Sequence, residues 1–365
     1  MQERPPVSII TGYLGSGKTT LLNRLLRDPG MARAAVIINE FGEIGLDHLL
    51  VATPNENTVL LANGCLCCTI RGDLVETLAD LLSQRGAGGV PAFDRVLVET
   101  TGLADPVPIL RTIASDELIA PCVRLGAVIA MVDGVNGDGQ LDECPESVKQ
   151  AAVADCLLVS KTDLAGSPAR LRKRLSRVNP GARIHEVVRG EIAPGLLFGA
   201  ALDDPGADRE RVEHWLSEAA FVKAGRAALH RRNARGASHT DRIGTFAVRR
   251  EGAVSAAGLM AWLNLLAALK GASLLRVKAL VNVEGRPVAV HAVQSVIHEP
   301  VELRSWPSAD RSTRIVFITR DMARAELEAT LPALDLPAGR PDRGVAIDPE
   351  AYARFARVAA GFRTC

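Results

Sequence analysis

The chain has 365 residues, more than a single hydrophobic core usually organises, and its length therefore predicts two domains. Its 43 Lys and Arg residues nearly balance its 42 Asp and Glu residues, which leaves a formal net charge of +1. This balance argues against nucleic acid and anionic membranes as partners, because both attract strongly basic surfaces. No apolar run approaches the roughly 20 residues of a membrane span, and we expect a cytoplasmic protein that acts on a compact ligand.

The first motif is a glycine-rich loop between a predicted strand and a predicted helix. The apolar run Val7–Ile10 is followed by Gly-Tyr-Leu-Gly-Ser-Gly-Lys-Thr at residues 12–19, which matches the pattern G-x-x-x-x-G-K-[ST]. In this pattern, backbone N–H groups of the loop surround a phosphate chain at the N-terminus of the next helix. Lys18 is expected against the β- and γ-phosphates, and the Thr19 hydroxyl is expected to bind Mg²⁺. The alternative, a glycine-rich turn without a ligand, does not account for the flanking strand and helix.

Two further predicted strands follow, and each leads into a loop with polar or reactive residues. Ala34–Ile38 ends in the loop Asn39–Asp47, and Thr58–Leu61 runs into a loop with three cysteines. Buried strands followed by polar, glycine-containing loops are the places where α/β proteins carry their chemistry. The leucine spacing of Asp73–Gln84 then predicts a helix.

An acidic residue ends the next apolar strand. Val96–Glu99 is followed by Thr-Thr-Gly, and a hydrophobic run that ends in an acid downstream of a phosphate loop is the Walker B arrangement. The Glu99 carboxylate is expected to hold Mg²⁺ directly or through water. Ala127–Asp133 and Cys156–Ser160 are two more apolar strands. The alternation of strands with helices predicts the α/β fold of a P-loop NTPase, with a mostly parallel sheet, helices on both faces and ligands at the carboxyl edge.

The tetrad Ser-Lys-Thr-Asp at residues 160–163 follows the last of these strands and resembles the N-K-x-D pattern that reads guanine. The Asp163 carboxylate can accept from the guanine N1–H and 2-amino groups, while the Lys161 stem packs over the base. Adenine offers no such pair of donors, so the tetrad favours GTP over ATP. The alternative is a solvated turn between strand and helix. Ser160 stands in place of Asn, and the loss of the supporting amide is expected to weaken the site without changing its selectivity.

Three of the seven cysteines lie within four residues, at Cys65, Cys67 and Cys68. They are too close together for an ordinary disulfide framework, and thiolates select soft or borderline ions such as Zn²⁺, Cu(I) and Co²⁺. Three protein ligands leave a tetrahedral position for water, a carboxylate or a ligand from a recipient protein. The alternatives are buried small hydrophobic residues or a redox pair.

A change in composition precedes a smaller unit with α and β elements. Its predicted helix, Val254–Lys270, carries a stripe of large apolar residues, which we expect to pack in the core of the unit rather than in a partner groove. Its strands are predicted at Ile243–Arg249, Leu274–Val283, Pro287–Gln294 and Arg314–Thr319. We therefore predict a GTPase domain over residues 1–205, a linker over 206–240, a smaller C-terminal α+β domain over 241–330 and a tail over 331–365.

These motifs together resemble the CobW-type P-loop GTPases, a family that includes zinc metallochaperones, cobalamin-synthesis proteins and activators of metalloenzymes such as nitrile hydratase. The resemblance covers residues 7 to about 330. It implies an N-terminal GTPase domain with a metal-binding C-X-C-C loop and a C-terminal CobW domain. The residues that carry it are Gly12–Thr19, Asn39–Glu43 with Asp47, Gly64–Cys68, Glu99–Pro106, Ser160–Asp163 and Leu275–Lys278.

The resemblance also implies the ligands and the residues that bind them. The implied ligands are GTP, Mg²⁺ and Zn²⁺ or Co²⁺. The implied nucleotide-binding residues are Gly12, Gly15, Ser16, Gly17, Lys18, Thr19, Thr20, Lys161 and Asp163. The implied catalytic residues are Lys18, Asp47 and Glu99, and the implied Mg²⁺ ligands are Thr19, Asp47 and Glu99. The implied transition-metal ligands are Cys65, Cys67 and Cys68, with Glu43 as a candidate fourth.

The function that the resemblance implies is that of a GTP-hydrolysing metallochaperone, which delivers a transition metal to a client metalloprotein. Zinc is the first choice of metal, cobalt and iron are alternatives, and a nucleotide-dependent homodimer stays open. A second hypothesis is a metal-responsive GTP-binding regulatory module with vestigial hydrolysis. A third is a kinase or ATP-driven enzyme, against which Ser160–Asp163 weighs. Two departures from the family pattern are Ile38, where some members carry Glu, and the reduction of a His-rich run to His230 and His239.

Overall fold

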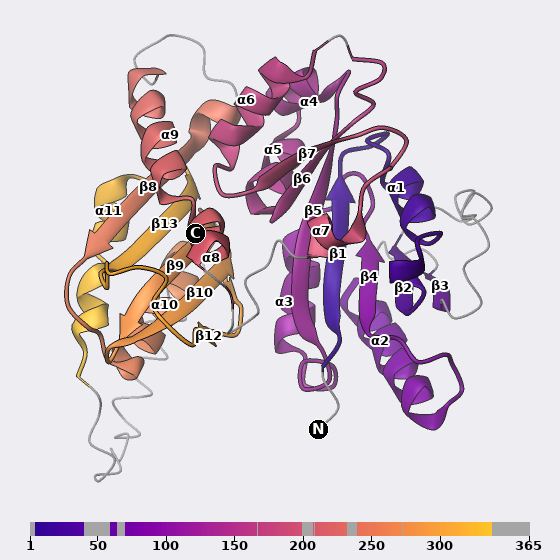
Figure 1. The fold of residues 1–365 in the computed structure, drawn as a ribbon, viewed down its shortest axis with the longest axis horizontal. Coiled ribbons are helices and arrows are strands. Elements are labelled where there is room, and N and C mark those ends of the chain that lie inside the picture. The colour runs from indigo at the N-terminus through magenta and orange to yellow at the C-terminus, as the bar shows by residue number, and fades with distance from the viewer. Residues whose placement is uncertain are drawn as a thin grey trace, which may run out of the picture.

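The N-terminal part of the chain forms a seven-stranded sheet with the strand order β3-β2-β4-β1-β5-β6-β7 (Figure 1). Every neighbouring pair in it is parallel. The carboxyl ends of its strands therefore meet at one edge. The strands are β1 (Pro6–Gly12), β2 (Ala34–Asn39), β3 (Val59–Asn63), β4 (Arg95–Glu99), β5 (Arg124–Asp133), β6 (Cys156–Ser160) and β7 (Arg183–Val187). The computed structural model describes residues 4–39, 59–63, 70–165, 167–198, 207, 209–231, 239–271 and 273–337.

Helices cover both faces of this sheet. They are α1 (Lys18–Leu25), α2 (Ile70–Ala87), α3 (Pro106–Ser115), α4 (Gly137–Glu143), α5 (Pro145–Val153), α6 (Ala169–Val178) and α7 (Pro194–Phe198), with a short 3₁₀ turn at Pro29–Met31. Ile9 on β1 packs in one core with residues of α2, α3, α5 and α6, whereas its neighbour Ile10 packs in a second core with residues of α1 and α7. The sheet is thus buried on both sides, which confirms the predicted fold class. Within the described ranges, no helix is both long and apolar enough to cross a membrane.

The C-terminal domain is a six-stranded antiparallel sheet with the order β11-β10-β9-β13-β8, in which β12 pairs with β10. Helix α10 covers one face, and the predicted apolar stripe lies in the core: Leu259, Trp262, Leu263 and Leu266 are all buried. The elements are β8 (Ile243–Arg250), α10 (Ala256–Lys270), β9 (Leu274–Val283), β10 (Arg286–Val293), β11 (Val296–Ile297), β12 (Val301–Glu302), β13 (Thr313–Arg320) and α11 (Arg324–Glu328), with 3₁₀ turns at His239–Arg242 and Leu331–Asp335.

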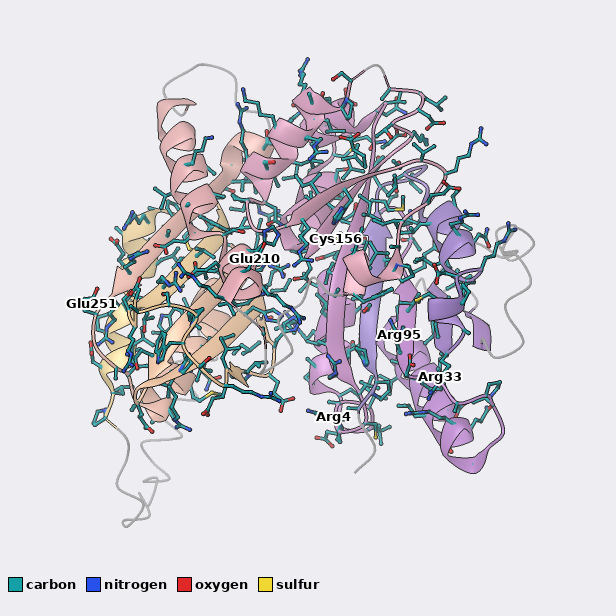
Figure 2. All side chains as sticks on the ribbon, viewed as in Figure 1. Arg4, Arg33, Arg95, Cys156, Glu210 and Glu251 are labelled. Atoms are coloured by element: carbon teal, nitrogen blue, oxygen red, sulfur yellow. The ribbon has the colours of Figure 1, made fainter. Side chains whose placement is uncertain are left out.

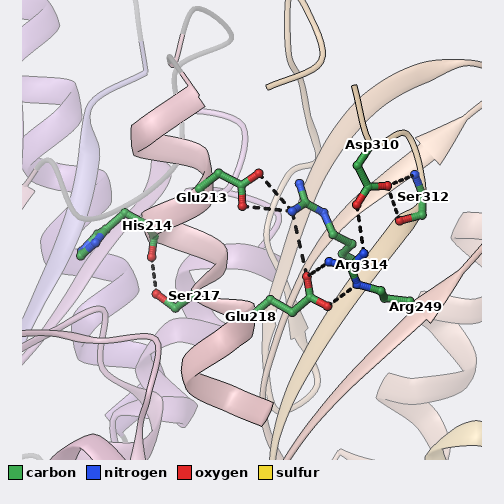
Figure 3. Close-up of polar contacts among 8 residues, drawn as sticks. All are labelled: Glu213, His214, Ser217, Glu218, Arg249, Asp310, Ser312 and Arg314. Carbon is green, nitrogen blue, oxygen red and sulfur yellow. Dashed lines mark hydrogen bonds and ion pairs between the residues drawn. The ribbon is translucent and has the colours of Figure 1, made fainter. Parts of the chain in front are cut away.

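The range 206–240, predicted from its composition as a linker, contains two helices, α8 (Arg209–Leu216) and α9 (Glu218–Arg231). Figure 3 shows how their junction is tied to the C-terminal sheet. Nη1 of the buried Arg314 on β13 donates to both carboxylate oxygens of Glu213, each at 3.0 Å. Arg249 on β8 donates to both oxygens of Glu218, at 2.6 and 2.9 Å. These contacts join distant parts of the sequence, which a reading of local composition does not detect.

The two domains share a continuous boundary, and a buried ion pair lies in it. Arg276 on β9 pairs with Asp155, which directly precedes β6, and also donates to the carbonyl oxygen of Val153 at the end of α5. The side chains of Arg276 and Asp155 are only 1% and 2% exposed. Figure 2 shows side chains of both domains between the two sheets. Apolar residues of both domains belong to the same core.

Lys278, two residues further along β9, faces the same boundary because successive side chains of a strand alternate between its faces. Its ammonium donates to the carbonyl oxygens of Gly181, at 3.0 Å, and of Trp215 on α8, at 3.2 Å. Burial, together with the charge of the nearby Arg276, lowers the pKa of Lys278 to about 7. The motif Leu275–Lys278, singled out in the sequence, thus supplies two buried basic side chains to the domain boundary.

Candidate nucleotide-binding site

The glycine-rich loop lies between the end of β1 and the start of α1, as its pattern predicts. Gly12 has a φ of 139°, and a Cβ on it would stand 2.4 Å from the carbonyl oxygen of Met131 on β5. Gly17, the N-cap of α1, has a φ of 95°, in the left-handed region that other residues rarely adopt. Gly15 and Ser16 complete the loop. The N-terminal N–H groups of α1 therefore open onto a loop in which three glycines carry no side chain, which suits a phosphate chain.

The side chains of Lys18 and Thr20 extend in different directions from the first turn of α1. The Lys18 ammonium folds back over the loop and donates to the carbonyl oxygens of Gly12 at 3.0 Å and Tyr13 at 3.4 Å. Lys18 is buried, whereas Thr20 is exposed. Lys18 is thus already held over the loop, where phosphate oxygens are stronger acceptors for its charge than carbonyl oxygens are.

Thr19 meets the acid predicted from the Walker B pattern. Its hydroxyl donates to Glu99 Oε1 at 3.2 Å, and Glu99 is buried at the carboxyl end of β4, beside Ile10 of β1. The hydroxyl of Thr100 donates to the hydroxyl of Thr11 at 2.9 Å, which fixes the ends of β4 and β1 to each other. A hydroxyl and a carboxylate at one point are the hard oxygen donors that Mg²⁺ prefers, so this pair fits the ion.

The predicted base-reading tetrad is tied to the phosphate loop by Ser160. The Ser160 hydroxyl donates to the carbonyl oxygen of Ser16 at 2.7 Å and also lies 3.3 Å from that of Val132. The serine therefore supplies a contact of its own to the phosphate loop, although it lacks the amide that was expected to support this site. Lys161 follows, and Asp163 lies two residues later on an exposed turn. The structure thus brings the phosphate loop and the tetrad to one edge of the sheet.

One residue of this site was not predicted from the sequence. Asp133, the last residue of β5, pairs with Lys161, with Oδ2 at 2.8 Å from Nζ. The side chain of Asp133 is only 2% exposed. Burial by itself raises the pKa of Asp133, but hydrogen bonds from Lys161, Asn136 and Val135 outweigh it and leave the pKa below its ordinary value. The only sequence signal for Asp133 was that it is an acid at the end of an apolar strand.

The loop after Glu99 is held between the phosphate loop and α5. Gln150 on α5 donates to the carbonyl oxygens of Gly102, at 3.2 Å, and Ala104, at 3.0 Å. A Cβ on Gly102 would stand 2.6 Å from the backbone nitrogen of Leu14, so only glycine allows this approach. The loop therefore contacts both the phosphate loop and the helix whose last carbonyl accepts from the C-terminal domain.

The strand order places further predicted site loops beside the nucleotide site. Asn39, the last residue of β2, is the register partner of Asn63, the last residue of β3, and Ile38 is the partner of Glu99. The loops that follow β2 and β3 therefore begin next to each other and next to Glu99. Among the described residues, no group of three His, Cys, Asp or Glu side chains could hold a metal ion. The predicted ligands and catalytic residue Glu43, Asp47, Cys65, Cys67 and Cys68 lie outside the described residues.

Comparisons with known proteins match both halves of the chain. The family described as "CobW/HypB/UreG, nucleotide-binding domain" matches residues 6–186, and the "Cobalamin synthesis protein cobW C-terminal domain" matches residues 243–334. "Zinc chaperone YjiA" of Escherichia coli (strain K12) is 41% identical over 192 residues, which are 53% of this chain and 60% of that protein. "Zinc-regulated GTPase metalloprotein activator 1" of Schizosaccharomyces pombe is 36% identical over 196 residues, which cover only 46% of its length.

Other matches extend over nearly the whole chain. "Zinc chaperone CobW" of Sinorhizobium sp is 27% identical over 368 residues, covering 91% of this chain and 98% of that protein. The crystal structure of Zn(II)-bound YjiA GTPase from E. coli superposes with a TM-score of 0.65 at 26% identity, covering 91% of this chain and 99% of the other. The matches to both family domains, in the same order along the chain, agree with the motifs and with the fold described above. The chain belongs to the CobW-type family of P-loop GTPases.

Proposed function

We propose that this protein is a GTP-hydrolysing metallochaperone, which binds a transition metal at Cys65, Cys67 and Cys68 and delivers it to a client metalloprotein. The observation that carries the proposal is the order of strand ends along the carboxyl edge of the parallel sheet. The cysteine-containing loop follows β3, the loop with Asp47 follows β2, and Glu99, the phosphate loop and the base tetrad follow in turn. Neighbouring loops of this kind suit a protein in which a nucleotide controls a metal site.

The nucleotide is proposed to be GTP, with Lys161 against the base and Asp163 accepting from its N1–H and 2-amino groups. Lys18 neutralises charge on the β- and γ-phosphates, and Thr19 and Glu99 would hold Mg²⁺. When bound, Mg²⁺ supplies positive charge to the phosphate oxygens. Asp47 is proposed to orient the attacking water.

The metal is proposed to be zinc, with cobalt or iron as alternatives, because thiolates select borderline and soft ions. The names of the YjiA and CobW relatives, both "zinc chaperone", support this choice. Three cysteines leave one tetrahedral position, which Glu43 would fill until a client ligand replaces it. The metal is the cargo of the protein rather than a resident cofactor.

GTP binding is proposed to change metal affinity through the loop Asn39–Asp47. A loop that contacts the γ-phosphate in the GTP state is released by hydrolysis, as in other GTPase switches. The register pair Asn39 and Asn63 supports this route, because the switch loop and the cysteine loop leave the sheet side by side. The client is a metalloprotein, which we expect the protein to meet in the cytoplasm.

A titration with Co²⁺ tests the metal site. Tetrahedral coordination by thiolates gives an intense visible ligand-field spectrum and sulfur-to-metal charge transfer in the near ultraviolet. Replacing Cys65, Cys67 and Cys68 together by Ser is expected to abolish both signals and to leave GTP binding intact. The matched control replaces Cys122 and Cys144, which lie elsewhere in the same domain, by Ser and keeps both signals. Signals that survive the triple replacement would contradict the proposed site.

A further inference from the structure

Asp133 lies at the carboxyl edge of the sheet, directly beside the base tetrad. It is the register partner of Ser160, so it stands one strand away from the start of the tetrad. Its Oδ1 accepts from the backbone nitrogens of Val135, at 2.8 Å, and Asn136, at 3.2 Å. Its Oδ2 accepts from the Asn136 amide at 3.1 Å and from Lys161 Nζ at 2.8 Å. Three of these four donors come from the turn after β5, which fixes the carboxylate before it meets Lys161.

The backbone of Lys161 is also fixed by hydrogen bonds, like its ammonium group. Its φ is 54°, a left-handed conformation that a residue with a side chain rarely adopts without support. Its carbonyl oxygen accepts from the backbone nitrogens of Leu164, at 3.0 Å, and Ala165, at 3.1 Å. The side chain is 36% exposed, so part of it is open to solvent between two fixed ends. The aliphatic stem therefore runs along one line, from the turn to Asp133.

We propose that Asp133 is a positioning residue for nucleotide specificity, which holds the Lys161 stem in place as a wall of the guanine pocket. The inference rests on the guanine site proposed above. A free lysine side chain samples many rotamers, and ordering it against a base costs binding free energy. The contact with Asp133 orders the stem before the nucleotide arrives. It also keeps the ammonium away from the phosphate loop, where Lys18 already supplies a cation.

The test compares binding of two probes, GTP and inorganic tripolyphosphate, by calorimetry in the presence of Mg²⁺. Lys161→Met keeps an apolar stem but cannot pair with Asp133, and Asp133→Asn removes the charge that holds Lys161. Each is expected to raise the Kd for GTP roughly tenfold and to leave the Kd for tripolyphosphate unchanged. The double variant is expected to be no weaker than either single variant, because both remove the same interaction.

The matched control is Asp142→Asn, which makes the same change on α4, where the acid pairs with Arg174. It is expected to bind both probes as the unmodified protein does. GTP binding by Lys161→Met at the original affinity would overturn the proposal, since the stem alone would then suffice. An Asp133→Asn protein that loses tripolyphosphate as strongly as GTP would also overturn it. An unmodified protein that binds ATP as tightly as GTP would instead refute the guanine site itself.

Discussion

Replacing Asp155 by Asn is expected to destabilise the folded protein by about 3–5 kcal/mol, because it leaves a buried cation without its counter-charge. The partner, Arg276, is 1% exposed, so water cannot replace the lost carboxylate. Asp155 Oδ2 also accepts from the backbone nitrogen of Val128, at 3.0 Å. Asn has a single acceptor oxygen and can satisfy only one of these two donors.

Urea unfolding followed by tryptophan fluorescence measures the effect, since Trp215 is buried at the same boundary. The matched control is Asp321→Asn, which breaks an exposed ion pair with Arg242. The side chains of Arg242 and Asp321 are 54% and 44% exposed. Exposed pairs contribute about 0–1 kcal/mol. Adding Arg276→Met to Asp155→Asn is expected to recover much of the loss, because the guanidinium that lost its counter-charge is then removed as well. Equal destabilisation by Asp155→Asn and Asp321→Asn would refute the reasoning.

Further predictions concern pH and the nucleotide. Because burial lowers the pKa of Lys278 to about 7, from an ordinary value of 10.5, the unfolded chain binds more protons than the folded protein between these values. The free energy of unfolding of the unmodified protein, relative to that of the Lys278→Met variant, is therefore expected to rise between about pH 7 and 9, by at most about 1.4 kcal/mol per pH unit. Urea titrations in which the difference between the two proteins does not change with pH would contradict this. Lys18→Ala is expected to abolish tight nucleotide binding, because the ammonium neutralises phosphate charge. Asp47→Ala is expected to bind GTP normally but to hydrolyse it more slowly in a phosphate-release assay. If the Asp47→Ala variant hydrolyses GTP at the original rate, Asp47 has no part in the mechanism. Asp163→Ala is expected to cost roughly 2–4 kcal/mol in GTP affinity by calorimetry and to leave ATP binding weak, and unaltered GTP affinity would exclude the base contact.

Local patterns in the sequence predicted those parts of the site whose chemistry is contained in a few consecutive residues. A phosphate loop needs glycines at fixed spacing before a helix, and Gly12–Thr19 shows them. Glu99 was predicted for a similar reason, because an acid that ends an apolar strand downstream of a phosphate loop is the Walker B pattern. The parallel sheet followed from the alternation of buried strands and helices.

Contacts between distant residues could not be predicted in this way. Asp133 and Lys161 are separated by 28 residues, and only the pairing of β5 with β6 brings them together. Arg276 and Asp155 are separated by 121 residues and meet across the domain boundary. The composition of residues 206–240 predicted a linker, and the ion pair of α8 with Arg314 is a contact that this local pattern does not contain.

The most direct test of the central claim, that the nucleotide controls the metal site, is the affinity for Zn²⁺ in two nucleotide states. A competing chelator measures it for the protein with a non-hydrolysable GTP analogue and for the protein with GDP. We expect the two Zn²⁺ affinities to differ by at least several-fold, within the range of about 5–150-fold that is typical of linked sites. In the Lys18→Ala variant, which lacks tight nucleotide binding, we expect the two affinities to be equal. Two equal affinities in the unmodified protein would contradict the central claim, because hydrolysis could then not drive release of the metal.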